Sequence, residues 1–221
     1  MTRPVSKLYI VATPIGNLKD ISLRALEILA SVDLVAAEDT RHTRRLLDHF
    51  EIKQKLIAFH DHNERRQTDL LVDRIKAGES VALVSDAGTP LISDPGFRLV
   101  RAARAADVVV EAVPGASALT AALSVSGLPT DQFQFLGFLP AKGRATRLAE
   151  VSQYPGTIIL YEAPHRMASL LETVLEVLGG DRELVICREL TKLYEQVVQG
   201  LAGEVRDQMI RCEIPARGEF V

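Results

Sequence analysis

The stretch VALVSDAGTPLISDPG, residues 81–96, decides the fold class of this chain. Its first four residues form a continuous apolar run, which is typical of a strand buried on both faces of a parallel sheet. A polar loop rich in glycine and proline follows, and we expect a helix after it, with Asp94 as N-cap and Pro95 at the first helical position. The stretch therefore predicts a strand–loop–helix unit of an α/β sheet.

The rest of the first half repeats this pattern. Apolar runs at 8–12, 34–37 and 108–113 alternate with amphipathic stretches such as 23–30, in which the apolar residues share one helical face. Such alternation predicts an α/β domain with a mostly parallel sheet covered by helices on both sides.

The second half predicts another α/β domain, with a mixed sheet. Its expected strands are residues 132–138, 157–161, 184–187 and 194–199. The turn-forming stretch 127–131 predicts the boundary, so the domains are expected at 1–126 and 127–221. Residues 218–221 resemble the beginning of a strand, and we expect the last strand of the second domain to be truncated.

Composition excludes some kinds of nucleic-acid binder. The 221 residues carry a net charge of −3, contain no Trp and are only 5% aromatic. These values argue against a constitutively basic protein and against an RNA module that stacks bases on aromatic platforms. Any RNA contact must come from local basic clusters or from a segment outside this chain.

Metal sites, disulfides and membrane anchors find no support. Cys187 and Cys212 lie far apart without His at a ligand spacing, and we expect Cys187 to be buried and inert. His60 and His62 lack a third ligand, so solvated loop histidines are the preferred interpretation and no metal is predicted. The apolar run near the N-terminus is too short for a signal peptide or a membrane span, which predicts cytoplasmic residence.

Three loops follow predicted strands, at the sheet edge where α/β proteins bind ligands: 13–18, 85–96 and 114–118. Each has an ordinary alternative: a plain strand-to-helix turn, turn capping by Asp86, and packing of a small-residue helix. The first loop matches neither of the two glycine-rich motifs that bind phosphate, the P-loop with its Gly-Lys-Ser/Thr and G-x-G-x-x-G. Together the loops suggest a nucleotide-like ligand without choosing among a nucleotide, a dinucleotide and S-adenosylmethionine.

The order of the motifs carries a resemblance to a known family. Residues 13–18, 37–41, 85–96 and 114–117, together with 161–166 and 188–192, resemble the ribosomal RNA small subunit methyltransferase I family. The match covers essentially the whole chain, and the 85–96 motif is highly specific. The family has the tetrapyrrole methylase fold, which implies two α/β domains with a cofactor cleft between them.

The resemblance implies an activity and partners. Members use S-adenosyl-L-methionine to methylate a cytidine ribose 2′-hydroxyl in the decoding region of 16S rRNA, within the small ribosomal subunit. It also implies a homodimer and a cofactor lined by the three loops and by one strand end of the second domain. The implied cofactor-binding residues are Pro14, Ile15, Gly16, Asp86, Ala87, Gly88, Thr89, Leu91, Ser117, Ala118, Tyr161, Glu162 and Ala163.

Residues at strand ends are the candidates for catalysis. A ribose hydroxyl is a weak acid, so a general base would assist its attack on the methyl group. The candidates of the first domain are Glu38, Asp39, His42, His60, Asp61 and His62, and those of the second are Glu162 and His165. Glu38 and Asp39, followed by Arg41, are preferred as substrate-facing residues. Capping of the next helix by Asp39 or Thr40 is the equally weighted alternative.

Basic clusters are the candidates for RNA contacts, although a solvated helix face explains any one of them equally well. They comprise Arg41, Arg44 and Arg45; Arg65 and Arg66; and Lys142, Arg144 and Arg147. The residues predicted to bind substrate are Arg41, His42, Arg44, Arg45, Lys142 and Arg144.

Two other functions remain open at this point. One is a small-molecule methyltransferase of the same fold that acts on a tetrapyrrole carbon, against which the 85–96 motif weighs. The other is a non-catalytic, ribosome-associated module that binds a nucleotide.

Overall fold

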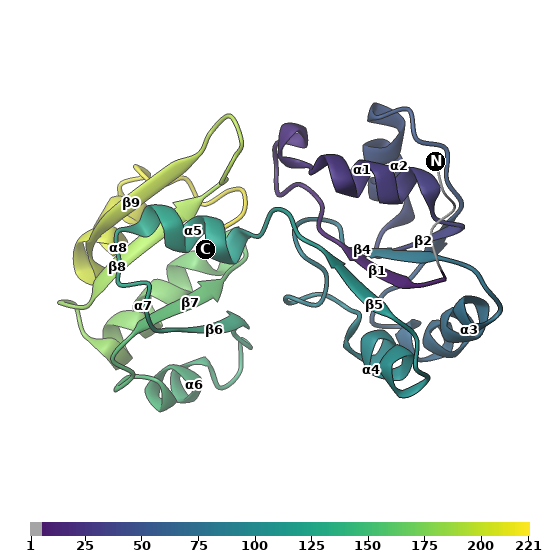
Figure 1. The fold of residues 1–221 in the computed structure, drawn as a ribbon. Helices are drawn as coiled ribbons and strands as arrows, with labels where there is room; N and C mark the ends of the chain where they lie inside the picture. The colour runs from purple at the N-terminus through teal and green to yellow at the C-terminus, as the bar shows by residue number, and fades with distance from the viewer. Residues whose placement is uncertain (1–5) are drawn as a thin grey trace. The chain divides into compact units, whose positions relative to one another are not determined.

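The computed structural model describes residues 6–221 and divides into two compact units, Met1–Ser117 and Ala118–Val221 (Figure 1). The boundary lies after Ser117, whereas the sequence predicted it after Ser126. Helix α5 (Ala118–Ser126) contacts strands β8 (Glu183–Arg188) and β9 (Gln196–Leu201), so it belongs to the second unit. The turn residues after this helix therefore lie inside that unit.

The first unit contains a five-stranded parallel sheet. Its strands are β1 (Leu8–Val11), β2 (Leu34–Ala37), β3 (Leu56–Ala58), β4 (Val81–Val84) and β5 (Val110–Val113), in the order β3-β2-β4-β1-β5. The four predicted strands are confirmed to within two residues. Strand β3, whose three residues are all partly buried, was not among the predicted runs, although residues 56–59 are as long an apolar run as residues 34–37.

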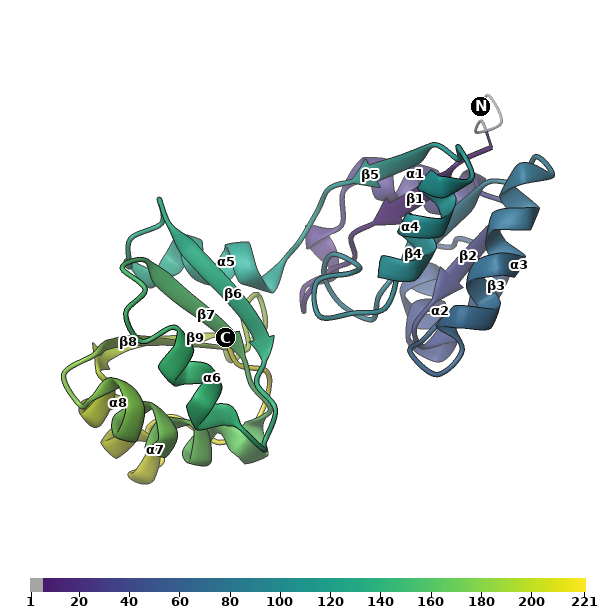
Figure 2. The same cartoon turned by 90° about the horizontal axis from the view of Figure 1, so that it is seen from below.

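Helices cover both faces of this sheet (Figures 1 and 2). Tyr9 and Val11 pack against α1 and α2, whereas the alternate residue Leu8 packs against α3 and α4. Because the side chains on both faces of the sheet pack against apolar residues of the helices, each strand is a continuous apolar run in the sequence. The helices are η1 (Leu18–Asp20), α1 (Leu23–Ser31), α2 (Thr40–His49), α3 (Glu64–Lys76) and α4 (Phe97–Ala105).

The predicted start of α4 was wrong. The helix begins at Phe97 with Gly96 as its N-cap, at φ 136°, so Asp94 does not cap it. Instead Glu64, on α3, accepts hydrogen bonds from the backbone N–H groups of Gly96 (3.0 Å) and Arg98 (3.2 Å). A carboxylate from a neighbouring helix thus satisfies these amides, and a sequence pattern local to the helix cannot reveal it.

The second unit has mixed strand pairing. Strands β6 (Phe133–Phe138) and β7 (Thr157–Tyr161) are parallel, and β8 and β9 are antiparallel. Phe220 forms antiparallel bridges with Glu162, beyond β7, and with Arg188, at the end of β8. The remaining helices are α6 (Arg144–Glu150), η2 (Pro164–Arg166), α7 (Met167–Leu178) and α8 (Ala202–Ile210).

Cys187 is buried, as predicted, at the end of β8. Burial raises the pKa of its thiol to about 11, so the thiolate nucleophile is scarce at neutral pH. Among residues 6–221, no helix combines the length and the apolar character that crossing a membrane requires.

Candidate functional site

Three loops at the carboxyl edge of the first sheet are joined to one another. Thr13, after β1, and Gly88, after β4, exchange backbone hydrogen bonds of 2.8 and 3.0 Å. The hydroxyl of Thr89 donates to the carbonyl of Ala116, after β5, at 3.1 Å. The structure therefore brings together the loops that the sequence singled out.

Glycine permits this close approach at Gly88. Its φ is 82°, and a Cβ built there would lie 3.3 Å from Cγ2 of Ile15. At Gly115 a Cβ would lie 3.1 Å from the Cβ of Ala12. Leu91 and Ser93 also adopt positive φ, at 75° and 67°, which costs energy for residues with a Cβ. Strained backbone of this kind gathers at functional sites.

Acidic groups from two neighbouring strand ends meet beside these loops. The backbone N–H of Asp39 donates to the Asp86 carboxylate at 3.0 Å, and the N–H of Asp86 lies 3.5 Å from the Glu38 carboxylate. Burial raises the pKa of Glu38 above its usual value, and the negative charge of Asp86 raises it further. The pair therefore concentrates negative charge at the ends of β2 and β4.

Asp94 belongs to the same group of carboxylates. Burial raises its pKa to about 6, against a hydrogen bond with Ser85 that lowers it, and the charges of Glu38, Asp86 and Asp61 raise it further. Carboxylates that raise one another's pKa in this way would be stabilised by a bound cation.

Asp39 has a different environment from Glu38. It is the N-cap of α2, accepting from the backbone N–H of Arg41 at 2.8 Å, and its other oxygen pairs with the Arg41 guanidinium at 2.7 Å. The Arg41 side-chain and backbone hydrogen bonds hold the pKa of Asp39 well below its usual range. Helix capping, the alternative that the sequence left open, is thus observed for Asp39.

The predicted substrate-binding residues of α2 differ in how far their side chains are exposed to solvent. His42 and Arg45 are exposed. Arg44 is half-buried and donates to the carbonyl of Gln54 at 3.0 Å, which ties α2 to the segment before β3. Arg41 is exposed over 87% of its side chain despite its pairing with Asp39.

The predicted cofactor residues of the first unit cluster in the joined loops. Thr89 and Leu91 are partly buried, and Gly88 is buried between its neighbours. Pro14 and Ile15 are buried, whereas Gly16 and Ala87 are exposed. Ser117, partly buried, ends the unit just beyond Ala116. Small or backbone-exposing groups thus line the edge.

In the second unit, Glu162 lies in a buried ionic cluster. Its side chain is 2% exposed and lies 3.3 Å from the guanidinium of Arg144, which is 7% exposed, and 3.2 Å from that of Arg166. Arg144 also donates to Ser169 at 2.9 Å. This placement commits Arg144 to the interior, while Lys142 is exposed.

Tyr161 and Ala163 flank this cluster. The Tyr161 hydroxyl accepts from the backbone N–H of Leu119 at 3.0 Å, close to predicted Ala118, which begins α5. The ring of Tyr161 contacts those of Phe135 and Phe138 edge to face. Ala163 donates its N–H to Glu162 at 2.9 Å.

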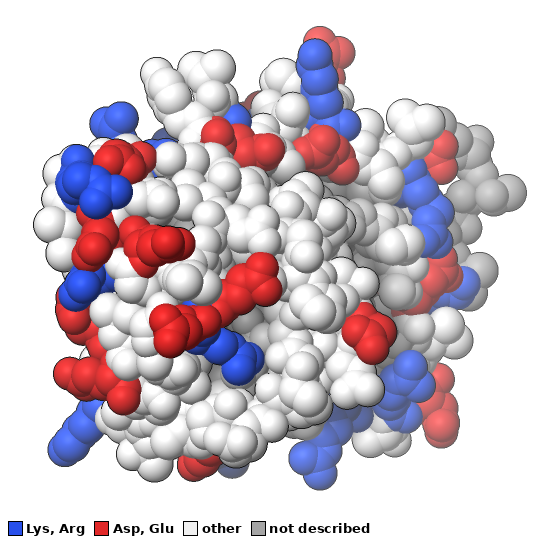
Figure 3. Space-filling view, turned by 90° about the vertical axis from the view of Figure 1, so that its left-hand side faces the viewer, with Lys and Arg blue, Asp and Glu red and all other residues white. Residues whose placement is uncertain are grey.

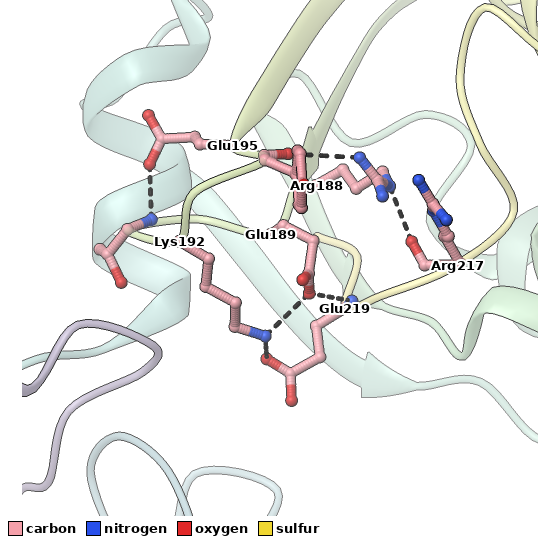
Figure 4. Close-up of polar contacts among 8 residues, drawn as sticks. Arg188, Glu189, Lys192, Glu195, Arg217 and Glu219 are labelled. Carbon is pink, nitrogen blue, oxygen red and sulfur yellow. Dashed lines mark hydrogen bonds and ion pairs between the residues drawn. The ribbon is translucent and has the colours of Figure 1, made fainter.

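A second ionic network follows β8 (Figure 4). Lys192 bridges the carboxylates of Glu189 and Glu219 at 2.8 Å each. Arg188, which is buried, donates to the carbonyls of Arg217 (2.7 Å) and Tyr194 (3.2 Å). Burial would raise the pKa of Glu189, but the hydrogen bonds from Lys192 and Glu219 lower it below its usual value. The network holds the loop after β8 against residues 217–219.

The contacts that three residues make at the candidate site of the first unit were not predicted from the sequence. Thr13 links two loops through its backbone, and Glu64 acts from another helix, so neither leaves a local signal. Asp94 was interpreted as a helix cap, although its position in a strand-following loop beside Asp86 could have marked it as part of the site.

Comparisons with known proteins identify the family of the chain. The family of tetrapyrrole (corrin/porphyrin) methylases matches residues 7–206. The chain is 55% identical to ribosomal RNA small subunit methyltransferase I of Xylella fastidiosa, over 97% of this chain and 79% of that protein. It is 57% identical to the protein of the same name from Vibrio cholerae, over 88% and 68%.

Solved structures support the fold. Uroporphyrin-III C-methyl transferase from Thermus thermophilus, complexed with S-adenyl homocysteine, superposes with a TM-score of 0.66 at 19% identity, over 97% of this chain and 95% of that one. At this identity the likeness concerns the fold alone. The family match and the close relatives show more: the chain belongs to the tetrapyrrole methylase family, in its ribosomal RNA small subunit methyltransferase I group.

Proposed function

We propose that the chain uses S-adenosylmethionine to methylate the 2′-hydroxyl of a cytidine ribose in the decoding region of 16S rRNA. The observation that carries the proposal is the joining of three strand-end loops beside the carboxylates of Glu38, Asp86 and Asp94. Membership of a group named for methylation of small-subunit rRNA supports the substrate class.

The residues present fit a sulfonium nucleoside. The cofactor supplies a methyl group on a positively charged sulfur. Carboxylates whose pKa values are raised by burial and mutual repulsion gain stability from such a charge. The free oxygen lone pairs of Asp86 suit ribose hydroxyls, and the backbone around Gly88 allows a flat ring to approach. Of the predicted residues, those of the 13–16 and 86–91 loops and Ser117 are the proposed contacts from the first unit.

Glu38 is the proposed general base. Its raised pKa brings it nearer to neutrality, where a carboxylate accepts a proton more effectively, whereas the lowered pKa of Asp39 makes that carboxylate a weak base. Positioning of the ribose hydroxyl against the methyl group would supply a large part of the rate, about 7–11 kcal/mol for well-oriented reactants. Asp39 and Arg41 then orient the substrate.

The second unit contributes support rather than proton transfer in this proposal. Glu162 is held by two guanidiniums, so we assign it to stabilising the strand end that carries Tyr161 and Ala163, two further proposed cofactor contacts next to Ala118. Arg41, His42, Arg45 and Lys142 are exposed and remain proposed RNA contacts. We also propose a homodimer that works in the cytoplasm.

One experiment separates the proposal from its rivals. Purified protein is incubated with methyl-labelled S-adenosylmethionine and either small subunits from a strain lacking the enzyme or free uroporphyrinogen. Label on a cytidine ribose of 16S rRNA is the expected result. Label on the tetrapyrrole alone would assign a small-molecule methylase, and cofactor binding without transfer to either would assign a non-catalytic module.

A further inference from the structure

A groove runs between α3 and α4 on the surface of the first unit, where the two helices lie side by side (Figures 1 and 2). Its volume is about 660 Å³. Arg65, Thr68 and Asp69 line it from α3, and Phe97, Arg98 and Arg101 from α4. Both helices begin at the carboxyl edge of the sheet, so the groove starts beside the loops that carry Asp61 and Asp94.

The groove is positive although the chain as a whole is negative. Three guanidiniums face one lining carboxylate, Asp69, against a net charge of −3 for the whole chain. Arg65 and Arg101 are exposed, and neither side chain makes an ion pair or hydrogen bond with any residue in the range 6–221. Their charges are therefore available to an anionic partner.

The side chain of Arg98 makes an ion pair with Glu64 but stays largely exposed to solvent. It lies 3.5 Å from the carboxylate of Glu64, yet 65% of its side chain is exposed, against 11% for Glu64. Glu64 also accepts the N–H groups at the start of α4, so its charge is shared with that helix end. The Arg98 guanidinium lines the groove and keeps most of its surface open to a partner.

Phe97 adds an apolar platform beside these charges. It is 66% exposed at the first position of α4, directly after the 85–96 loop. An exposed aromatic ring next to unpaired arginines is the combination that binds single-stranded nucleic acid, through base stacking and phosphate contacts. On the face drawn in Figure 3, by contrast, acidic side chains lie among the basic ones and break up any positive surface.

We propose that this groove binds a single-stranded segment of the RNA substrate, with Arg65, Arg98 and Arg101 on phosphates and Phe97 stacked on a base. The inference deepens the proposed function and rests on it. It adds a docking surface on α3 and α4 to the predicted contacts on α2.

The test measures binding of a fluorescein-labelled single-stranded 16S rRNA fragment across a range of salt concentrations. In the Arg65→Ala/Arg101→Ala variant, the slope of log affinity against log salt should fall by about 1 for each arginine. Phe97→Ala should weaken binding about fivefold or more with the slope unchanged. The matched control is Lys76→Ala/Arg104→Ala, which removes two exposed cations from the same helices outside the groove.

Three results would overturn the inference. The groove variants could bind the fragment as the unaltered protein does, or the control could lose as much affinity as the groove variant. A shift of oligomeric state in Phe97→Ala, measured by light scattering, would instead make the groove an interface between copies. Calorimetry with S-adenosylmethionine keeps the proposed function separate, since cofactor affinity should be the same in all these variants.

Discussion

The backbone N–H of Asp39 donates a 3.0 Å hydrogen bond to the carboxylate of Asp86, 47 positions further along the chain. The bond links the ends of β2 and β4, which are neighbours in the sheet. One carboxylate thus holds an adjacent loop in place while keeping acceptor capacity for a ligand. The raised pKa values of Glu38 and Asp94 depend in part on the same charge.

Asp86→Asn should separate the charge of Asp86 from its structural hydrogen bond. The amide oxygen still accepts the Asp39 N–H, but the negative charge is gone. Hydrogen bonds to charged groups contribute about 1.5–3 kcal/mol, so S-adenosylmethionine should bind at least tenfold more weakly by calorimetry. The neutral product, S-adenosylhomocysteine, should lose less affinity. Asp73→Asn, an exposed change on α3, is the control, and an equal loss there would contradict the assignment.

Gly88→Ala should impair cofactor binding through the new methyl group. Gly88 and Gly78 both have positive φ, 82° and 103°, so alanine strains the backbone by about 1–2 kcal/mol at either place. At Gly88 the Cβ would also meet Ile15, whereas at Gly78 it would meet nothing within 4 Å. Urea unfolding should show at least as much destabilisation for Gly88→Ala as for Gly78→Ala, and only Gly88→Ala should weaken cofactor binding. Equal cofactor binding by the two variants would refute the proposal that the cofactor lies close to the backbone at Gly88.

The cluster of acidic side chains formed by Glu38, Asp86 and Asp94 predicts a pH dependence of cofactor binding. A sulfonium cation favours the ionised carboxylates, so binding releases protons and becomes tighter as the pH rises through about 6, the pKa of Asp94. S-adenosylhomocysteine carries no sulfonium and should show a much smaller change. Calorimetry of both ligands between pH 5 and 8 checks this, and parallel pH profiles would rule out contact between the sulfonium and these acids.

The same pKa has a consequence for folding stability. Folding raises the pKa of Asp94 from its usual value of 3.8 to about 6. Its protonated form therefore favours folding at low pH. That contribution declines as the pH rises from about 4 to about 6. In Asp94→Asn this part of the decline should disappear from the free energy of unfolding, measured in urea at several pH values. An unchanged pH profile would show that Asp94 is not perturbed.

Glu162→Gln tests whether the buried cluster is structural. Removing one partner of a buried ion pair typically costs about 3–5 kcal/mol, because Arg144 is left with an uncompensated charge. Glu150→Gln breaks the exposed pair with Arg147 and should change stability little. Urea unfolding of the two variants gives the comparison. A stable Glu162→Gln that binds cofactor normally but has lost methyl transfer would return Glu162 to a catalytic role.

The sequence predicted those elements of the fold that leave a pattern of apolar residues within a short stretch of chain. Both units and all their strands except β3 were predicted, because buried strands leave continuous apolar runs, as at Val81–Val84. Small shifts occurred at edges, where β9 begins at Gln196 rather than at 194. Among the last residues, Phe220 forms isolated bridges to Glu162 and Arg188 and no strand, and these two partners could not be predicted from the sequence.

The loops of the candidate site could be predicted from the sequence, but the contacts between them could not. Position after a buried strand marked Glu38, Asp86 and the 114–118 segment, since parallel strands end at one edge. Burial was not visible: Arg144 looks like a surface charge in the sequence but pairs with Glu162 in the interior. Charge environment also depends on tertiary contacts, which is why Glu38 and Asp39, adjacent in the chain, have pKa values shifted in opposite directions.

A crystal structure of the protein with S-adenosylhomocysteine would show whether the joined loops of the first unit bind the cofactor. We expect the ligand at the carboxyl edge of the first sheet, with the backbone of residues 13–16 and 86–89 within contact distance and Asp86 hydrogen-bonded to a ligand hydroxyl. A ligand bound elsewhere, with these loops making no contact to it, would refute the proposed cofactor site.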